Sequence, residues 1–167
     1  MKNHSKTVAF LGVCTALALI LAYVEILLQP LFPTLPGIKM GLPNIIIIFL
    51  LYRRGEKCAI GVSLLRIFLT SMLFGNAMAL LYSLSGGILS LLVMMLLRRL
   101  NFLSTLGVSV AGAVMHNVGQ ILAAMLVLET LELGYYLVIL TVSGTIAGVL
   151  IGLAGSLLIK KIPQKLV

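Results

Sequence analysis

The sequence contains no aspartate and has few charged residues of either sign. Among its 167 residues, four are acidic, all of them glutamate, and twelve are lysine or arginine. Two-metal enzymes that act on phosphoryl or diphosphate groups need several carboxylates close together. The four glutamates are scattered along the chain, so we expect neither a metal site of this kind nor an autonomous enzyme.

Other signatures of enzymes and channels are missing as well. The sequence has no Walker A motif for ATP hydrolysis and no Cys-x-x-Cys-His motif for haem attachment. Its two cysteines, Cys14 and Cys58, make neither a disulfide framework nor a metal site, and we interpret them as inert packing residues. A single arginine inside a span, Arg66, forms no recognisable filter of an ion channel. We therefore expect no cofactor and no bound metal.

The long apolar runs predict an all-α, integral membrane protein. Hydrophobic residues make up 61% of the chain and charged residues 10%, a composition that a soluble domain of this length would not carry. A transmembrane helix needs about 20 residues, so the chain has room for six spans and little else. We predict a single membrane domain over residues 1–167, a polytopic bundle with six transmembrane helices at about residues 7–28, 41–52, 57–74, 77–97, 105–128 and 135–159.

The basic residues predict the orientation of these spans. Ten of the twelve fall at the two termini and in every second connection, namely Lys2, Lys6, Arg53, Arg54, Lys57, Arg98, Arg99, Lys160, Lys161 and Lys165. Because cytoplasmic loops are enriched in lysine and arginine, this pattern predicts an even number of spans with both termini in the cytoplasm. The membrane topology explains the net charge of +8, so we expect no nucleic-acid partner.

The first apolar segment is long, whereas the second departs from an ideal span. Residues 16–18 weakly resemble a signal-peptidase site, but further spans follow, so we interpret the first helix as retained. The second segment is short, and four prolines crowd residues 29–43 before and at its start. Since proline lacks a backbone donor and restricts the residue before it, we expect 29–43 to form an ordered, non-helical outer loop.

Small residues recur at four-residue spacing in the last span and in the first. The last span carries Gly144, Gly148, Gly152 and Ser156, and the first span pairs Gly12 with Ala16 and Ala18 with Ala22. Small side chains on one helix face let another backbone approach closely in a membrane. We favour packing inside the bundle for the last span. For the first span, docking of another membrane subunit is a nearly equal alternative.

Among the residues of the predicted membrane interior, Arg66 has the highest free-energy cost of burial in lipid. It shares one helix face with Ala59, Ser63 and Thr70, which are small or polar, so we expect this face to point inward. A guanidinium stays charged and offers a fork of donors suited to carboxylate or phosphate. Two interpretations remain open: Arg66 contacts a ligand, or it forms a structural ion pair with Glu25.

A second polar group lies on the fifth predicted span. His116 and Gln120 are four residues apart and stack on one face, whereas Asn117 points about 100° away and could bond a neighbouring helix. One histidine without nearby cysteine or aspartate is a poor metal site. A proton relay and a polar network that joins helices both remain alternatives to ligand binding.

Several motifs together resemble a known bacterial family, heptaprenyl diphosphate synthase component I, also called the Gx transporter family. They are the run Gly37-Ile38-Lys39-Met40-Gly41-Leu42-Pro43-Asn44, the lone Arg66, the run Ser83-Leu84-Ser85-Gly86-Gly87, and the run His116-Asn117-Val118-Gly119-Gln120. The similarity extends from about residue 7 to 160, and the last of these motifs is the most specific. The family is itself similar to the substrate-binding S components of energy-coupling factor (ECF) transporters.

The resemblance implies an ECF S-component-like bundle that binds a small molecule near its outer side. It implies a ligand cavity, for which the candidate residues are Lys39, Asn44, Arg66, Asn76, His116, Asn117 and Gln120. It also implies that the first helix docks, through Gly12, Ala16, Ala18 and Ala22, onto a transmembrane coupling subunit driven by two ATPases. The only strict Ala-x-x-x-Ala pair there, Ala18 with Ala22, lies far toward the outer side.

The sequence thus favours a substrate-binding subunit in the bacterial plasma membrane, without enzymatic activity of its own. Its ligand would be a small molecule, anionic or aromatic, taken up with ATP-driven partners across the lipid bilayer. The alternative is a non-catalytic accessory subunit in prenyl-quinone biosynthesis or in flavin-linked extracellular redox metabolism. The synthase name fits the residues poorly, because prenyl diphosphate synthases carry aspartate-rich metal motifs and this chain has no aspartate.

Overall fold

A computed structural model describes residues 2–28 and 41–163 of the chain, and all of its regular structure in these ranges is helical. The prediction of an all-α protein is therefore confirmed for the described residues. The helices are α1 Lys2–Leu28, α2 Asn44–Arg53, α3 Glu56–Phe74, α4 Ala77–Arg99, α5 Thr105–Leu128 and α6 Tyr136–Lys161, and a short 3-10 helix η2 at Glu132–Tyr135 precedes α6. The predicted outer loop at 29–43 lies outside the described residues except for 41–43.

Five of these helices are long and apolar enough to cross a membrane: α1, α3, α4, α5 and α6. The chain therefore has the architecture of a multi-pass membrane protein. The second predicted span is different, because α2 has 10 residues and reaches only about 15 Å at the rise of an α-helix. The hydrocarbon core is about 30 Å thick. The prediction that this segment is a transmembrane helix is thus not confirmed, since α2 alone cannot cross.

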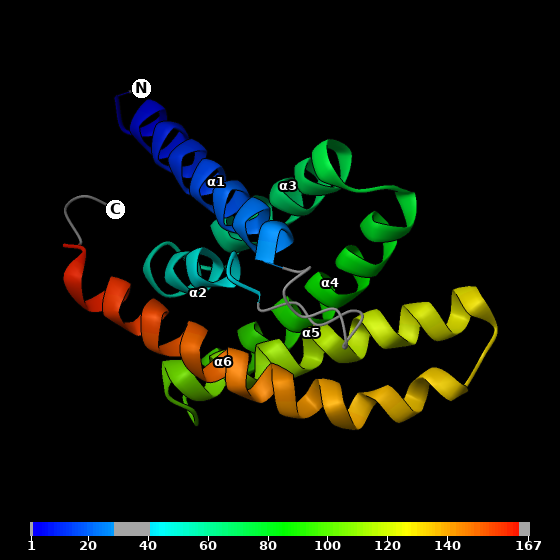
Figure 1. Cartoon of the computed structure of the whole chain (residues 1–167). Coiled ribbons are helices and arrows are strands. Elements are labelled where there is room, and N and C mark those ends of the chain that lie inside the picture. The colour runs from blue at the N-terminus through cyan, green and yellow to red at the C-terminus, as the bar shows by residue number, and fades with distance from the viewer. Residues whose placement is uncertain (1, 29–40, 164–167) are drawn as a thin grey trace.

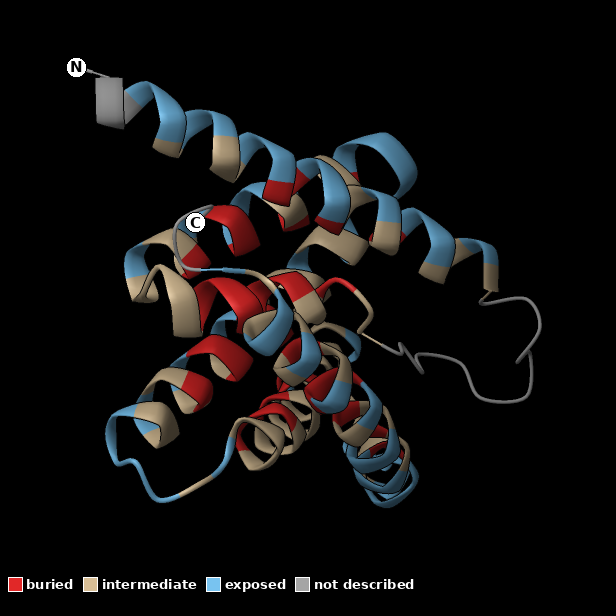
Figure 2. Ribbon diagram, turned by 90° about the vertical axis from the view of Figure 1, so that its left-hand side faces the viewer, coloured by how far each residue is buried: buried red, intermediate tan, exposed pale blue. Residues whose placement is uncertain are grey.

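The short helix α2 lies in the middle of the bundle and forms its core. Six consecutive residues, Ile46 to Leu51, are buried, and Figure 1 shows α2 between α1, α3 and α6. In Figure 2 the buried segments gather at this centre, while the outer faces of the helices are exposed. A helix that is apolar on every side is stable when protein surrounds it. The run of four isoleucines at residues 45–48 suits this position.

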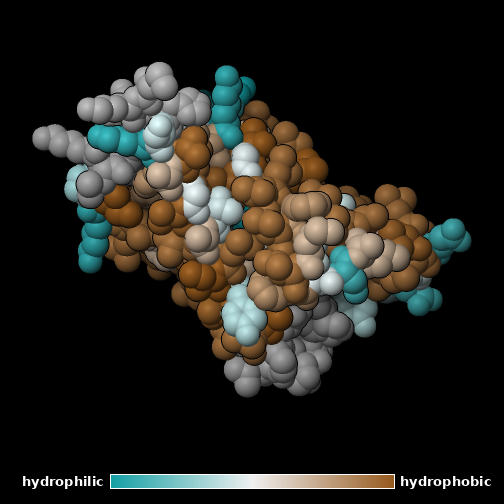
Figure 3. All heavy atoms as spheres, turned by 90° about the horizontal axis from the view of Figure 1, so that it is seen from above, coloured by the Kyte–Doolittle hydropathy of each residue, from teal (hydrophilic) through white to brown (hydrophobic). Residues whose placement is uncertain are grey.

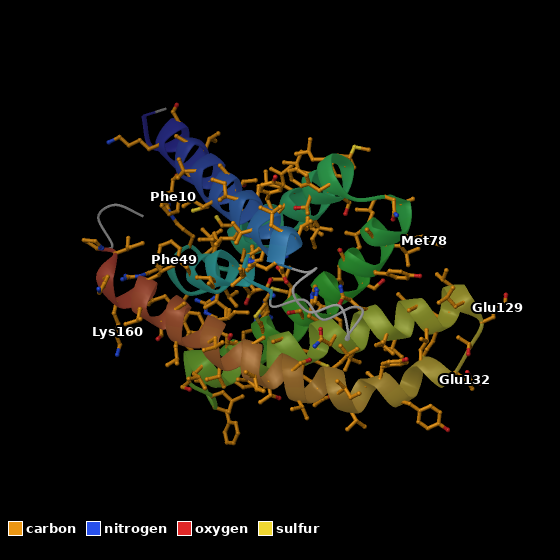
Figure 4. All side chains as sticks on the ribbon, in the orientation of Figure 1. Phe10, Phe49, Met78, Glu129, Glu132 and Lys160 are labelled. Atoms are coloured by element: carbon orange, nitrogen blue, oxygen red, sulfur yellow. The ribbon has the colours of Figure 1, made fainter. Side chains whose placement is uncertain are left out.

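Contacts at both ends of α2 show that it runs antiparallel to α1. At its start, the amide of Gly41 donates a hydrogen bond of 2.7 Å to Glu25 near the end of α1. At its other end, the ring centroids of Phe49 and Phe10 are 6.4 Å apart, and Figure 4 shows the two side by side. The guanidinium of Arg54 lies 5.3 Å from the centre of the Phe10 ring.

The end of α2 also contacts the end of α6. The Nη2 of Arg53 donates to the carbonyl oxygens of Ile159 and Ile162. These carbonyls belong to the last turn of α6 and to the residue that follows it, where backbone acceptors lack partners in the helix and a cation is favourable. The start of α1 and the end of α6 therefore lie on the same side of the bundle, as Figure 1 shows.

Glycines join α4, α5 and α6 into a closely packed layer. A Cβ atom built on Gly119 of α5 would lie 2.7 Å from the carbonyl oxygen of Ser85 on α4. On α6, a Cβ at Gly148 would lie 2.7 Å from the Cα of Val110, and one at Gly152 would lie 3.0 Å from the Cα of Leu106. The small-residue face of the last span therefore packs against α5 inside the bundle, as favoured from the sequence.

The outer surface is apolar, as expected for contact with lipid. In Figure 3 hydrophobic residues cover most of the visible face, and hydrophilic ones gather at its edges. Figure 4 shows Glu129 and Glu132 at the far end of the α5–α6 hairpin and Lys160 at the opposite end of α6. Acidic and basic side chains thus mark opposite ends of this helix pair.

Candidate ligand-binding cavity

A cavity of about 250 Å³ lies between α1, the start of α2, α3, α4 and α5. It is lined by Ala22, Glu25, Ile26, Gly41, Asn44, Arg66, Ile67, Thr70, Ser71, Phe74, Gly75, Ala79, Ser83 and His116. Three of the residues predicted to bind a ligand, Asn44, Arg66 and His116, come together in these walls from three different helices. The cavity combines charged and hydroxyl groups with apolar side chains.

The inward face of α3 brings Arg66 into the cavity. Ser63 and Ala59, one and two turns earlier on this face, are buried, as the three- and four-residue spacing predicts. The Nη2 of Arg66 donates to the Oδ1 of Asn44 at 3.4 Å, a long hydrogen bond. The Nε of Arg66 is buried and has no hydrogen-bond partner among the described residues. The guanidinium therefore keeps donor capacity inside the cavity.

Glu25 places a negative charge on the wall formed by α1. Its Oε1 accepts the hydrogen bond from the amide of Gly41. Gly41 has φ +72, a left-handed conformation that glycine adopts without strain. A Cβ at this position would also lie 3.1 Å from the Nδ2 of Asn44. Gly41 thus connects two cavity residues, and Glu25 lies near enough to act electrostatically on Arg66.

Gly86 of α4 allows the backbone carrying His116 to approach closely. A Cβ at Gly86 would lie 2.6 Å from the carbonyl oxygen of His116 and 2.8 Å from the Cγ of Gln120. His116 is buried and faces the cavity. Gln120 packs against Gly86 and is not part of the cavity wall. The stacking of His116 and Gln120 on one face is as predicted, but the cavity includes only the first.

The structure places Asn117 between helices. Its Nδ2 donates a 2.8 Å hydrogen bond to the carbonyl oxygen of Leu140 on α6, and Gly144 leaves room for the amide, since a Cβ there would lie 2.7 Å from that nitrogen. This is the alternative that the 100° offset from His116 suggested. Asn117 is buried outside the cavity and joins α5 to α6.

Two further candidate residues lie elsewhere. Asn76 caps the start of α4, where its Oδ1 accepts a 2.8 Å hydrogen bond from the amide of Ala79. Asn76 is exposed and is not part of the cavity wall, although its neighbour Gly75 is. Lys39 lies outside the described residues.

The four residues predicted for subunit docking are divided between two faces of α1. Ala18 and Ala22 are buried inside the bundle, and Ala22 contributes to the cavity wall. Gly12 and Ala16 are exposed, and a Cβ on Gly12 would meet no atom within 4 Å. Only Gly12 and Ala16 lie on a surface that a second protein could reach, so the Ala18–Ala22 pair serves internal packing.

Several polar residues of the cavity wall were not predicted from the sequence to bind a ligand. Glu25 was considered only as an ion-pair partner, and Thr70 only as part of the Arg66 face. Ser71 was not singled out, because serine is common in membrane helices and carries no distinctive signal, and Ser83 was named only as part of a family motif. Their position in the wall depends on how the helices pack.

A second, larger hollow lies between α4 and α5 on the outside of the bundle. It measures about 470 Å³ and is lined by Leu81, Ser85, Leu89, Gly119, Leu122, Ala123, Leu126 and Val127. Its walls are almost entirely apolar, so it offers no group that would orient a polar ligand. The described part of the chain contains no group of three histidine, cysteine or glutamate side chains able to hold a metal ion.

A family model confirms the resemblance noted from the motifs. The model for heptaprenyl diphosphate synthase component I matches residues 14–158. The chain belongs to this family. Comparisons with curated proteins and with solved structures give no match. The matched range includes every residue of the cavity wall, and the family description names a component of a synthase, which implies a partner component.

Proposed function

We propose that this protein is a non-catalytic membrane subunit that binds a small molecule in the Arg66 cavity for uptake by ATP-driven partner subunits. One observation carries the proposal: Arg66, Asn44 and His116 line a single cavity of about 250 Å³. A charged side chain within a membrane helix is costly unless it faces a partner or a water-filled cavity. Sites for small molecules combine a few converging polar groups with apolar walls, as this cavity does.

The orientation of the chain supports capture from outside the cell. We propose that both termini lie on the cytoplasmic side of a bacterial plasma membrane, because lysine and arginine gather at the end of the bundle that holds them. The shared side of the two termini requires an even number of crossings. Five of these are the long helices, and we propose the segment that contains α2 as the sixth.

Cysteine labelling of intact cells tests this topology. In a variant with Cys14 and Cys58 replaced by alanine, a cysteine at Glu132 should react with a membrane-impermeant maleimide. A cysteine at Asn101, in the turn between α4 and α5, should react only after the cells are opened. Reaction at both positions in intact cells would refute the proposed orientation.

The partners in this proposal are a transmembrane coupling subunit and two ATPases of the ECF type. Gly12 and Ala16 of α1 support a docking surface, because both are exposed and neither packs inside the bundle. A leucine at Gly12 should reduce co-purification of the coupling subunit, whereas a leucine at the equally open Gly61 of α3 serves as the control for added bulk.

Family membership favours a second function, that of a membrane component of a prenyl diphosphate synthase. In that case the partner would be a catalytic synthase subunit, and this chain would supply no catalytic carboxylate. A role in flavin-linked extracellular redox metabolism remains part of this alternative. Mass spectrometry of proteins captured by an affinity tag separates the candidates: ATPases and a coupling subunit support uptake, and a prenyl synthase or a flavin-transfer protein supports the alternative.

The cavity itself is tested by the small molecules that the protein retains. Wild-type protein purified in mild detergent should release a bound small molecule on denaturation, detectable by mass spectrometry. Arg66→Lys should lower its amount about tenfold, because lysine keeps the charge but not the planar fork of donors. Arg99→Lys is the matched control, since Arg99 pairs with Glu56 on the surface, with an Nη2–Oε2 distance of 2.5 Å.

The competing structural interpretation gives the opposite result. If Arg66 serves only to neutralise Glu25, Arg66→Lys should be mild, and Arg66→Ala should lower the melting temperature by leaving a carboxylate without its countercharge. Retention of the same amount of small molecule by Arg66→Lys and by wild-type protein would overturn the role of Arg66 in binding.

A further inference from the structure

The hydroxyl of Thr70 is not bonded to its own helix, unlike the hydroxyls of Thr15 and Thr145. The buried hydroxyls of Ser90 and Ser109 also have no partner among the described residues, but neither lines the cavity. Threonine and serine inside helices commonly donate to the carbonyl four residues earlier. Thr15 donates to Leu11 at 2.9 Å, and Thr145 donates to Thr141 at 2.8 Å. The Oγ1 of Thr70 is buried in the cavity wall and has no hydrogen-bond partner among the described residues. A buried polar group of this kind calls for a partner from outside the described residues.

The second donor of this kind is the Nε of Arg66, one turn before Thr70. Residues four apart on a helix lie on the same face, about 5–6 Å apart between their Cβ atoms. Both side chains line the cavity, and both present a buried donor that no described residue accepts. Two donors at this spacing suit the two oxygens of one carboxylate, which can accept from a guanidinium and a hydroxyl together.

The wall formed by α1 carries the charge of the other sign. Glu25, on α1, faces the same space, and its carboxylate is held in place by the Gly41 amide. The charges of Arg66 and Glu25 sum to zero. An occupant with several negative charges would be attracted by Arg66 and repelled by Glu25 in a poorly hydrated site, where such effects are strong. An occupant with one negative and one positive group meets a favourable charge at each end.

The remaining walls define the body of the occupant. Ile26, Ile67 and Phe74 provide apolar surface, and the ring of Phe74 lies 5.0 Å from that of Tyr23. A cavity of about 250 Å³ is slightly smaller than typical sites for drug-sized molecules, which start at about 300 Å³. The occupant is therefore small, and a heptaprenyl chain could not enter.

We propose that the ligand is a small zwitterion with an apolar body, resembling an apolar amino acid in its charge distribution. Its carboxylate accepts from the Nε of Arg66 and the hydroxyl of Thr70, and its ammonium group faces Glu25. This inference rests on the proposed function, in that it names the class of molecule captured. It separates that class from prenyl diphosphates, whose diphosphate group carries several negative charges.

Thermal unfolding of the wild-type protein in lipid nanodiscs tests whether the ligand is a zwitterion, with probes of similar shape and different charge. Phenylalanine and leucine are the zwitterions, 3-phenylpropanoate lacks the ammonium group, 2-phenylethylamine lacks the carboxylate, and isopentenyl diphosphate represents the diphosphates. We expect at least one zwitterion at millimolar concentration to raise the melting temperature by several degrees. Each singly charged relative should give a smaller shift, and the diphosphate should give none.

Variants of Thr70 and Glu25 test which wall of the cavity binds each end of the zwitterion. Thr70→Val removes the hydroxyl at constant shape and should weaken zwitterion binding about tenfold, as loss of a hydrogen bond to a charged group does. Thr70→Ser should restore it. Thr145→Val is the matched control, because that hydroxyl already bonds its own helix. Glu25→Gln should reduce the preference for phenylalanine over 3-phenylpropanoate, while Thr70→Val should leave that ratio unchanged.

The outcomes separate this inference from the proposed function. Stabilisation by the diphosphate but by no zwitterion, abolished in Arg66→Lys, would overturn the zwitterion and leave small-molecule capture intact. The absence of any shift with every probe would overturn the zwitterion as well. If, in addition, denatured wild-type protein released no small molecule, the proposed function would fail with it. Equal binding in Thr70→Val and wild-type protein would refute the role of the hydroxyl.

Discussion

The two halves of this bundle pack in opposite ways. Along α4, α5 and α6, glycines bring backbones together, so that a Cβ at Gly86, Gly119 or Gly148 would lie within 2.7 Å of a neighbouring helix. Along α1 and α3, Gly12 and Gly61 meet no atom within 4 Å. The half formed by α4, α5 and α6 is closely packed through contacts between its own helices. The half formed by α1, α2 and α3 provides most of the cavity wall, to which α4 and α5 also contribute, and it leaves open surface.

This difference shows that glycine content alone does not predict close packing in a membrane protein. Both halves contain glycines within long apolar helices, but only α4–α6 use them for contact between backbones. Where van der Waals contact drives association between helices, the closely packed half provides stability. The polar cavity lies where the loosely packed half meets α4 and α5, and most of its wall belongs to the loosely packed half.

The largest effect should come from filling the closest contact of the packed half. Gly119→Ala places a methyl group against the carbonyl oxygen of Ser85 and the backbone of Gly86, where no flexible side chain can yield. We expect a loss of about 2 kcal/mol in unfolding free energy, as for other overpacked cores. Reversible unfolding in mixed detergent measures this loss. A change below the error of the method would show that α4 and α5 can separate freely.

A smaller effect should follow from removing the polar link between α5 and α6. Asn117→Ala deletes the hydrogen bond to the carbonyl of Leu140 and should cost about 1 kcal/mol, near the range for such bonds in membranes. Ser143→Ala is the matched control, because Ser143 donates to the same carbonyl at 3.2 Å from within α6. If both variants lose the same stability, the link between helices has no special value.

The smallest effect should come from the open half. Gly61→Ala adds a methyl group where no atom lies within 4 Å, and alanine is favoured over glycine in a helix by up to about 1 kcal/mol. We expect unchanged or slightly increased stability in the same detergent assay. A destabilisation as large as that of Gly119→Ala would show that the two halves are packed alike, contrary to the comparison.

The sequence predicted the class of fold because its signals are local. Apolar runs, basic clusters and missing aspartate identify a helical membrane protein without depending on how the helices meet. The inward direction of the Ala59, Ser63 and Arg66 face followed from helical spacing alone, and the structure confirms it. The family motifs were equally readable, since they are continuous in the chain.

It was harder to predict which residues line the cavity. His116 and Gln120 share a face, but only His116 borders the cavity, because Gln120 meets Gly86 one turn away. Asn76 belongs to a helix cap. The sequence also suggested a span at residues 41–52, where the structure has a buried helix of 10 residues, because hydropathy does not distinguish lipid from protein as the apolar surroundings.

The sequence by itself thus determined what each segment is: helical, apolar, and charged at alternate ends. Only the tertiary structure decided which side chains meet, because the partners in the cavity come from helices far apart in the chain. Glu25, Asn44, Arg66 and His116 share one cavity since α2 lies between α1 and α6, and since Gly86 lets α5 approach α4. These contacts depend on distances between backbones, and no local pattern of residues encodes them.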